Sequence, residues 1–430
     1  MRQRHILLFW LPLFSSWLLM MAEGPLISAV VNRLPDAVVH LAVLGIVFSL
    51  AVAIESPIIN LLATSTAKVK DRQSYRQVRR LTLHWCAGLT LLAAAIAWTG
   101  LFDLVVVDWL GVPGEITRWV RPGMAIMVPW SAAIGWRRFL QGLLIVGGRT
   151  RAIAWGTAIR LATSAGIAAT LALTTQLPGS LVGAWGLVVG VGAEAAFATV
   201  AARPVIAGFE ARRDAPPLGY LELTRFHLPL AGTAVLTLLM QPLVTACLAR
   251  LDRPVATLAA WPLIFQFLLL ARAPALALPE VVIALAGPPE NRPGLWRFTR
   301  SLTLASLGAM ALFALTPLAD FYLRVLQNAE PAVASLAGLG FLLMTPLPAL
   351  ATLISWYRGL MIQQGRTPLV NGAMLVRLVA TTLLLLAGLA WQWSGIVTAA
   401  SAMVLSVVAE LVCLHSWSRR VGQPAADFRP

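Results

Sequence analysis

The sequence has 430 residues, of which 59% are hydrophobic and only 12% are charged, whereas soluble domains have about 45–50% and about 25%. This composition excludes a soluble globular domain, and the apolar segments lack the period-2 alternation of an outer-membrane barrel. The formal net charge of +15 does not indicate a nucleic-acid partner, because the basic residues lie in short loops between apolar segments.

Apolar segments of about 20 residues recur along the whole chain, and each is long enough to cross a bilayer core as a helix. Because backbone groups in lipid must pair within each segment, we predict an all-α polytopic membrane protein in a lipid bilayer. The first segment imitates a signal peptide, but no small-x-small cleavage site follows cleanly, so we interpret it as an uncleaved helix. The twelve predicted spans are residues 6–31, 38–63, 81–103, 120–145, 152–174, 180–202, 224–248, 256–286, 301–323, 332–360, 369–391 and 394–417.

Basic residues between the spans are divided unevenly between the two sides of the membrane. We assign 24 of them to one side, including Arg72–Arg80, Arg137, Arg138 and Arg358, and six to the other. The positive-inside rule therefore places both termini in the cytoplasm, and we expect a bacterial inner membrane.

The longest polar stretch follows the sixth span and is interpreted as a linker between two halves. The predicted organisation is an N-terminal six-helix bundle at 1–203, a cytoplasmic linker at 204–223, a C-terminal six-helix bundle at 224–418 and a cytoplasmic tail at 419–430.

The two halves are related by an internal repeat. A shift of 217 residues aligns the sequence with itself without a gap from residue 11 to residue 161, whereas Glu194 and Glu410 match at 216. Because each half has six spans, both enter the membrane in the same sense, as parallel bundles related by a pseudo-two-fold axis along the membrane normal. Such repeats are typical of secondary transporters, whose substrate site lies near the midplane between the halves. Identical matched residues include Pro25 and Pro242, Pro57 and Pro274, Gly142 and Gly359, and Arg160 and Arg377.

Charged residues within the spans are candidates for function, since each costs roughly 2.5–3.5 kcal/mol on insertion scales. Glu55 and Arg272 occupy matching positions with opposite charge, each two residues before a matched proline. Our hypothesis is that they face the central cavity as a gate or binding pair; the alternative is a structural ion pair that pins the helices. Glu23 and Glu55 are candidates for protonation or cation binding, because a carboxylate in an apolar site can cycle between charge states.

A second group of polar residues lies later in the sequence of each half. Arg160 and Arg377 would give the cavity a positive lining for an anion, or else snorkel to the interface. Glu194 and Glu410 would pair with them across adjacent helices, or act in coupling or gating. Further candidates to line a polar cavity are Gln241 and Gln266; the candidate kinks are Pro25, Pro57, Pro242 and Pro274.

The sequence lacks motifs for hydrolytic or ATP-driven chemistry. There is no Walker A sequence, no His-Glu-x-x-His and no nucleophile elbow, so we do not predict an enzyme. Cys86, Cys247 and Cys413 lie singly in apolar spans without metal spacing, so we expect neither a metal nor a disulfide framework. No cofactor is expected beyond a coupling H⁺ or Na⁺.

Several short segments carry a family resemblance. They are Trp10-Leu11-Pro12-Leu13, Ala22-Glu23-Gly24, Pro57, Leu228-Pro229-Leu230, Pro242-Leu243-Val244 with Arg250, Pro346-Leu347-Pro348, and Arg377-Leu378. With them the chain resembles the superfamily of multidrug and toxic compound extrusion transporters and polysaccharide flippases, and within it the progressive ankylosis protein family. The resemblance implies export of small anions such as pyrophosphate, nucleotides or citrate, with Glu23, Pro57, Arg250 and Arg377 as site residues. Glu55 departs from the small or neutral residue expected there.

The predicted function is therefore secondary-active export of a small anionic metabolite by alternating access, with Arg272 as the main anion contact. Alternatives within the superfamily are a flippase for lipid-linked glycans and a cation-coupled multidrug exporter, and a third is a non-transporting membrane scaffold. A monomer is compatible with the sequence.

Overall fold

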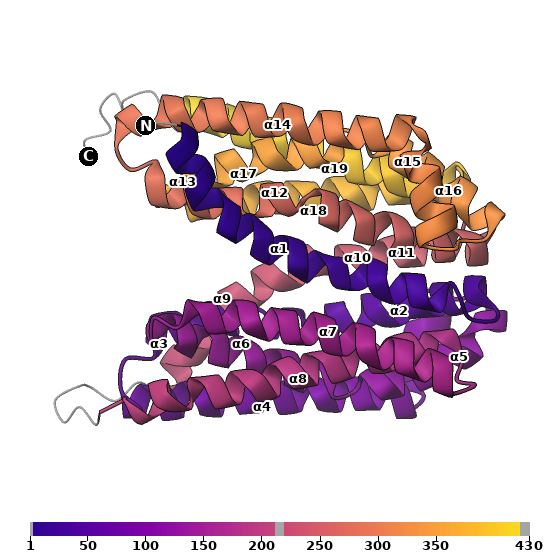
Figure 1. Ribbon diagram of the computed structural model, residues 1–430, viewed down its shortest axis with the longest axis horizontal. Coiled ribbons are helices and arrows are strands. Elements are labelled where there is room, and N and C mark those ends of the chain that lie inside the picture. The colour runs from indigo at the N-terminus through magenta and orange to yellow at the C-terminus, as the bar shows by residue number, and fades with distance from the viewer. Residues whose placement is uncertain (1–2, 211–218, 422–430) are drawn as a thin grey trace. The chain divides into compact units, whose positions relative to one another are not determined.

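The computed structural model describes residues 3–210 and 219–421, and within these ranges every regular element is a helix (Figure 1). The predicted linker and tail lie partly outside the described residues. The elements up to residue 210 are α1 Gln3–Val31, α2 Ala37–Glu55, η1 Ser56–Ile58, α3 Leu61–Lys68, α4 Arg72–Trp98, η2 Asp103–Trp109, α5 Gly114–Met127, α6 Trp130–Val146, α7 Thr150–Thr174 and α8 Gly179–Ala207.

The second part of the chain has a corresponding series of elements. They are α9 Tyr220–Leu238, α10 Met240–Leu248, α11 Pro254–Ala271, α12 Ala273–Leu276, α13 Leu278–Leu285, η3 Pro289–Asn291, α14 Arg292–Leu315, α15 Pro317–Asp320, η4 Phe321–Leu326, α16 Pro331–Leu343, α17 Leu347–Gln363, α18 Thr367–Ala390 and α19 Gly395–Val421.

In the described ranges, ten spans are long and apolar enough to cross a membrane, and an eleventh is formed by α16 and α17, which meet at 44°. The remaining predicted span, 120–145, falls on two shorter helices, α5 and α6, because Pro129 stands at their junction and has no N–H to continue the first helix. Apolar side chains such as Leu91, Leu304 and Leu383 are more than half exposed, as a lipid-facing surface requires. The prediction of an all-α polytopic fold is confirmed, and the chain is an integral membrane protein.

The helix boundaries reproduce the internal repeat. Helices α3 and α13 both begin and end 217 residues apart, and so do the starts of α6 and α17 and of α7 and α18. Left-handed residues follow the same offset, since Asp36 pairs with Arg253 and Gly148 with Gly365. Helices α8 and α19 begin 216 residues apart, because α18 is one residue shorter than α7. The two repeats therefore share helix boundaries and backbone conformation as well as identical residues.

One boundary differs from the prediction. The basic stretch Arg72–Arg80, assigned from the sequence to a loop before a span at 81, forms the first turns of α4. The helix begins early because Asp71 accepts a hydrogen bond from the Ser74 amide at 2.8 Å, while the Ser74 hydroxyl accepts from the Asp71 amide, forming a capping box. These arginines therefore lie on a helix that begins before its apolar part.

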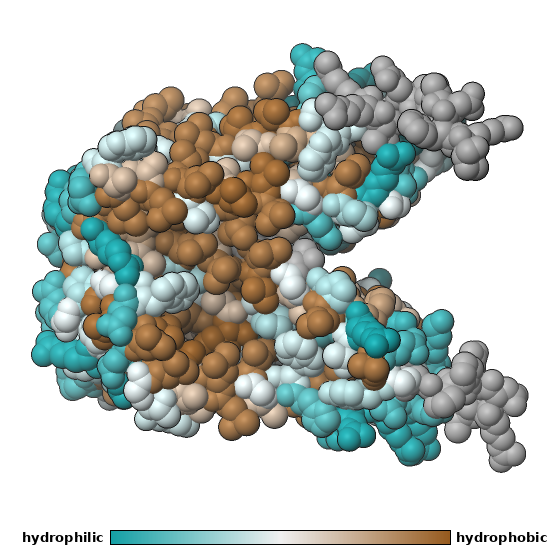
Figure 2. All heavy atoms as spheres, turned by 180° about the vertical axis from the view of Figure 1, so that it is seen from behind, coloured by the Kyte–Doolittle hydropathy of each residue, from teal (hydrophilic) through white to brown (hydrophobic). Residues whose placement is uncertain are grey.

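The chain forms two compact units, which are described separately. The N-terminal unit comprises the described residues of 26–250 and 254–259, and the C-terminal unit those of 1–25, 251–253 and 260–430. On the face drawn in Figure 2, apolar side chains cover the middle of each unit and hydrophilic ones gather toward the helix ends. Each unit thus has a surface suited to lipid at its middle and to water at its ends.

The first helix of each repeat packs mainly in the unit built from the other repeat. In the C-terminal unit, Trp10 of α1 donates from Nε1 to the carbonyl oxygen of Pro274 at 3.1 Å. In the N-terminal unit, His227 of α9 has Nε2 3.1 Å from the carbonyl oxygen of Pro57. Both partners in these two contacts are related by the 217-residue offset. The exchange of first helices is therefore a repeated feature of the fold.

Candidate functional site

A buried charge cluster lies in the N-terminal unit where α6, α7 and α8 meet. Arg137 of α6 donates from Nη1 to Glu194 Oε2 at 2.6 Å, and Gln141 donates from Nε2 to Glu194 Oε1 at 3.2 Å. Arg160 Nη1 of α7 lies 3.9 Å from Glu194 Oε2. Both oxygens of this carboxylate are therefore paired, so the predicted Arg160–Glu194 pairing is present within a larger cluster.

Glu55, the last residue of α2, belongs to the same unit. Its side chain is buried, and its Oε2 has no hydrogen-bond partner among the described residues. Arg137, Arg138 and Arg160 interact with it electrostatically. The helix ends at Glu55 because the next turn, Ser56–Ile58, contains Pro57 and narrows to a 3₁₀ helix.

A related cluster lies in the C-terminal unit, between α17, α18 and α19. Glu410 Oε1 accepts hydrogen bonds from Nε of Arg358, at 2.8 Å, and from its Nη2. Arg377 Nη1 lies 3.6 Å from Glu410 Oε2, so the predicted Arg377–Glu410 pair is also present. Arg272, at the break between α11 and α12, interacts electrostatically with all three groups.

This second cluster borders a small cavity of about 50 Å³. A volume of roughly 10–15 Å³ suffices for one water, so the cavity has room for a small anion or a few waters. The Nε atoms of Arg272 and Arg377 are buried without hydrogen-bond partners among the described residues. The lining consists of Arg272, Ala275, Leu276, Leu347, Ala351, Ile354, Ser355, Arg358, Arg377 and Val407.

Prolines predicted as kinks have carbonyl groups that accept side-chain hydrogen bonds. In addition to Pro57 and Pro274, the carbonyl of Pro25 accepts from Gln327 Nε2 at 3.1 Å. Pro242 is buried in α10, next to Gln241. Buried side-chain donors therefore pair with the carbonyls of three of these prolines.

Two further predicted residues, Glu23 and Gln266, lie on neighbouring helices of the C-terminal unit. Glu23 is a buried residue of α1, and the adjacent Gly24 packs against Gln266 of α11. A Cβ on Gly24 would come within 2.8 Å of the Gln266 side chain, so the two helices approach closely here. Glu55 and Arg272 lie in different units, and their predicted pairing therefore stays a prediction.

Three arginines of the clusters were not predicted. Arg137, Arg138 and Arg358 were assigned to basic loops, but they lie within α6 and α17 and belong to the two clusters. The sequence contained the signal, because all three fall inside the predicted spans 120–145 and 332–360. Gln141, the repeat counterpart of Arg358, carries no charge and gave no such signal.

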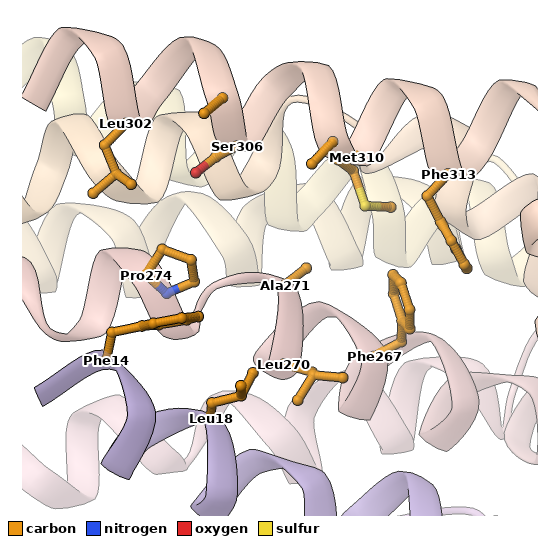
Figure 3. A pocket seen from close by; sticks show the side chains of 12 residues that line it. Phe14, Leu18, Phe267, Leu270, Ala271, Pro274, Leu302, Ser306, Met310 and Phe313 are labelled. Carbon is orange, nitrogen blue, oxygen red and sulfur yellow. The ribbon is translucent and has the colours of Figure 1, made fainter. Parts of the chain in front are cut away.

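An apolar pocket of about 370 Å³ lies elsewhere in the C-terminal unit, between α1, α11 and α14 (Figure 3). The side chains of Phe14, Leu18, Phe267 and Phe313 turn toward it. Ala271 and Pro274, on either side of Arg272 in the chain, also line this pocket. The helix break at Arg272 therefore contributes residues to both an apolar and a cationic cavity.

Solved structures that align with the chain include membrane transporters, although no protein-family model and no curated protein matches the sequence. An inward-facing multidrug resistance MATE family transporter of the MOP superfamily aligns at a TM-score of 0.69 with 14% identity, covering 95% of this chain and 96% of that one. The lipid II flippase MurJ, in an inward closed conformation, aligns at 0.72 with 13% identity, covering 96% and 87%. A MOP superfamily transporter from Pyrococcus furiosus, described by a reverse polarity of its binding pocket, aligns at 0.68 with 12% identity, covering 96% and 95%.

The architecture is therefore the twelve-helix MATE-type fold, which confirms the fold predicted from the sequence. At this level of identity the likeness establishes the fold alone, and the substrate must be argued from the residues of this chain.

Proposed function

We propose that this protein is a secondary-active transporter that exports a small anion by alternating access, in the manner implied by its resemblance to the progressive ankylosis protein family. The MATE-type fold supports the transporter class. The cationic cavity of the C-terminal unit supports the anionic substrate. The proposal places the protein in a bacterial inner membrane with both termini in the cytoplasm.

The observation that carries this proposal is the charge around the small cavity. Three guanidinium groups, from Arg272, Arg358 and Arg377, line it, and one carboxylate, that of Glu410, pairs with two of them. Unpaired charge within a membrane protein is costly and usually functional. An anion entering the cavity would offset the excess positive charge, and guanidinium groups bind carboxylate and phosphate oxygens well.

The coupling element of the proposal is in the N-terminal unit. Glu55 is buried beside three arginines and ends a helix at a proline break. Protonation or Na⁺ binding there would change the charge of the cluster and so favour one conformation over another. Glu23 is the second candidate, and Glu410 would act in gating.

Transport in proteoliposomes tests the proposal. The purified full-length protein is assayed with pyrophosphate, ATP, citrate and a cationic dye, with and without H⁺ and Na⁺ gradients. We expect flux of at least one anion, and its loss in Arg272→Gln. Arg324→Gln is the matched control, because Arg324 forms an exposed ion pair with Asp320. Flux of the dye alone would overturn the anion assignment.

A second candidate function, translocation of an anionic lipid-linked glycan, is favoured by the apolar pocket in Figure 3. The chain segment 271–274 borders both this pocket and the cationic cavity, so one ligand with an anionic group and a hydrocarbon chain would match both surfaces. A fluorescent lipid diphosphate in the same vesicles separates the two candidates. Faster flipping of this lipid together with no flux of soluble anions would support the second.

A further inference from the structure

We propose that Glu410 is an exchangeable counter-ion of the substrate site, whereas its repeat counterpart Glu194 is a permanent structural partner. This inference rests on the proposed anion transport. It assigns opposite roles to two glutamates that the repeat makes equivalent. In the absence of substrate Glu410 pairs with the arginines of the cavity, and an entering anion competes with it for the same guanidinium groups.

Each oxygen of Glu194 already accepts a hydrogen bond. Arg137 binds one oxygen at 2.6 Å and Gln141 binds the other at 3.2 Å. The side chains of Arg137 and Glu194 are 4% and 1% exposed. A buried pair with both oxygens satisfied is costly to break, because each partner would be left as an uncompensated charge.

Only one carboxylate oxygen of Glu410 is hydrogen-bonded among the described residues. Arg358 binds Oε1 through two nitrogen atoms, but Oε2 has no hydrogen-bond partner among the described residues, with Arg377 3.6 Å away. The Arg358 side chain is 26% exposed and borders the cavity, so an incoming anion can reach it. Val407, one helical turn before Glu410, also lines the cavity.

The repeat explains why the cavity is in this unit. Arg137 and Arg138 of α6 correspond to Ile354 and Ser355 of α17, and both of these shorter residues line the cavity. Glu55 corresponds to Arg272, which also lines it. The N-terminal unit thus has arginine side chains at these two positions. In the C-terminal unit the shorter residues leave a space, which is lined by Arg272, Arg358 and Arg377.

The same arrangement explains release of the anion. Three arginines alone would hold an anion tightly, and tight binding slows turnover. When Glu410 pairs again with Arg358 and Arg377, it lowers the affinity for the anion and favours its departure. Removing the carboxylate while keeping the shape of the side chain should therefore strengthen binding and slow transport.

The test compares Glu410→Gln with Glu194→Gln in the purified full-length protein. Binding of pyrophosphate and of citrate is measured by isothermal titration calorimetry, and flux in proteoliposomes. For Glu410→Gln we expect at least a tenfold lower Kd for the transported anion and a severalfold lower maximal flux. For Glu194→Gln we expect a lower unfolding temperature and a Kd within about twofold of wild type.

A second variant keeps the test decisive if Glu410→Gln folds poorly. Ser355→Arg introduces the residue that the other unit has at this position and fills the cavity without altering the Glu410 pair. We expect it to remain folded and to lose anion binding. Two outcomes overturn this inference alone when anion flux is measurable. The first is an unchanged or higher Kd in folded Glu410→Gln, and the second is unchanged anion binding in Ser355→Arg. Absence of anion flux and binding in the wild-type protein overturns the proposed function as well.

Discussion

Arg137 Nη1 lies 2.6 Å from Glu194 Oε2, and this ion pair joins α6 to α8 inside the N-terminal unit. Gln141, one turn further along α6, binds the second oxygen of the same carboxylate. Two residues of one helix therefore clamp one residue of another. The C-terminal unit has a single arginine, Arg358, at the position of Gln141, and it binds only one oxygen of Glu410.

Replacing Arg137 with Met should lower the free energy of unfolding by about 3–5 kcal/mol, since it leaves Glu194 as a buried charge without its closest partner. Chemical unfolding in detergent, followed by circular dichroism, measures the change. Arg324→Met is the control, because exposed pairs such as Arg324–Asp320 contribute only about 0–1 kcal/mol. Equal losses in both variants would contradict the structural role of the clamp.

The stability of the protein should depend on the buried hydrogen-bond donors of the exchanged first helices, α1 and α9. Trp10→Phe removes the hydrogen bond to the Pro274 carbonyl, and His227→Ala removes that to the Pro57 carbonyl. Each leaves a buried acceptor unpaired, at a cost of about 1–3 kcal/mol. Thermal unfolding in detergent measures both, with Trp391→Phe as an exposed control. A stability of Trp10→Phe equal to that of the control would argue against this role.

The matched glycines Gly142 and Gly359 should not tolerate alanine. A Cβ on Gly142 would collide with the Ser65 hydroxyl and lie 2.7 Å from the Leu62 carbonyl oxygen, and one on Gly359 would lie 2.8 Å from Val282. Overpacking of this kind costs about 1–3 kcal/mol.

Gly166→Ala is the matched control for these variants, because nothing lies within 4 Å of a Cβ there and alanine favours the helix by about 1 kcal/mol. Expression level and unfolding temperature report the difference. The prediction is wrong if the three alanine variants behave alike.

Glu55→Gln should abolish gradient-driven flux, since glutamine has nearly the same shape but cannot take up a proton or pair fully with a cation. Anion exchange without a gradient should persist at a reduced rate. Glu115→Gln, on the exposed first turn of α5, is the control. Gradient-driven flux at the wild-type rate in Glu55→Gln would remove Glu55 from the coupling site.

The fold was predictable because a bilayer permits few architectures and because Pro, Gly and Arg coincide at one offset. The ion pairs of Arg160 with Glu194 and of Arg377 with Glu410 were predictable for a related reason, since charges within spans need partners. Arg137 and Arg358 were misassigned because the positive-inside rule counts arginines without knowing which are buried. The cavity itself could not be predicted. It exists where Ile354 and Ser355 stand in place of the arginines of the other repeat, and only the packing of the helices shows that these residues line one space.

The exchange of first helices has a consequence for biosynthesis. A ribosome makes α1 before the other described helices, but most of this helix packs with partners synthesised hundreds of residues later, such as Pro274. Likewise, Asn60 and Thr64 of the N-terminal unit obtain their partners, Leu230 and His227, only when α9 emerges. Neither unit can therefore be completed from one repeat alone, and insertion into the membrane must run ahead of assembly. A chain cut between the repeats would reach its final packing only if both fragments were present in the same bilayer.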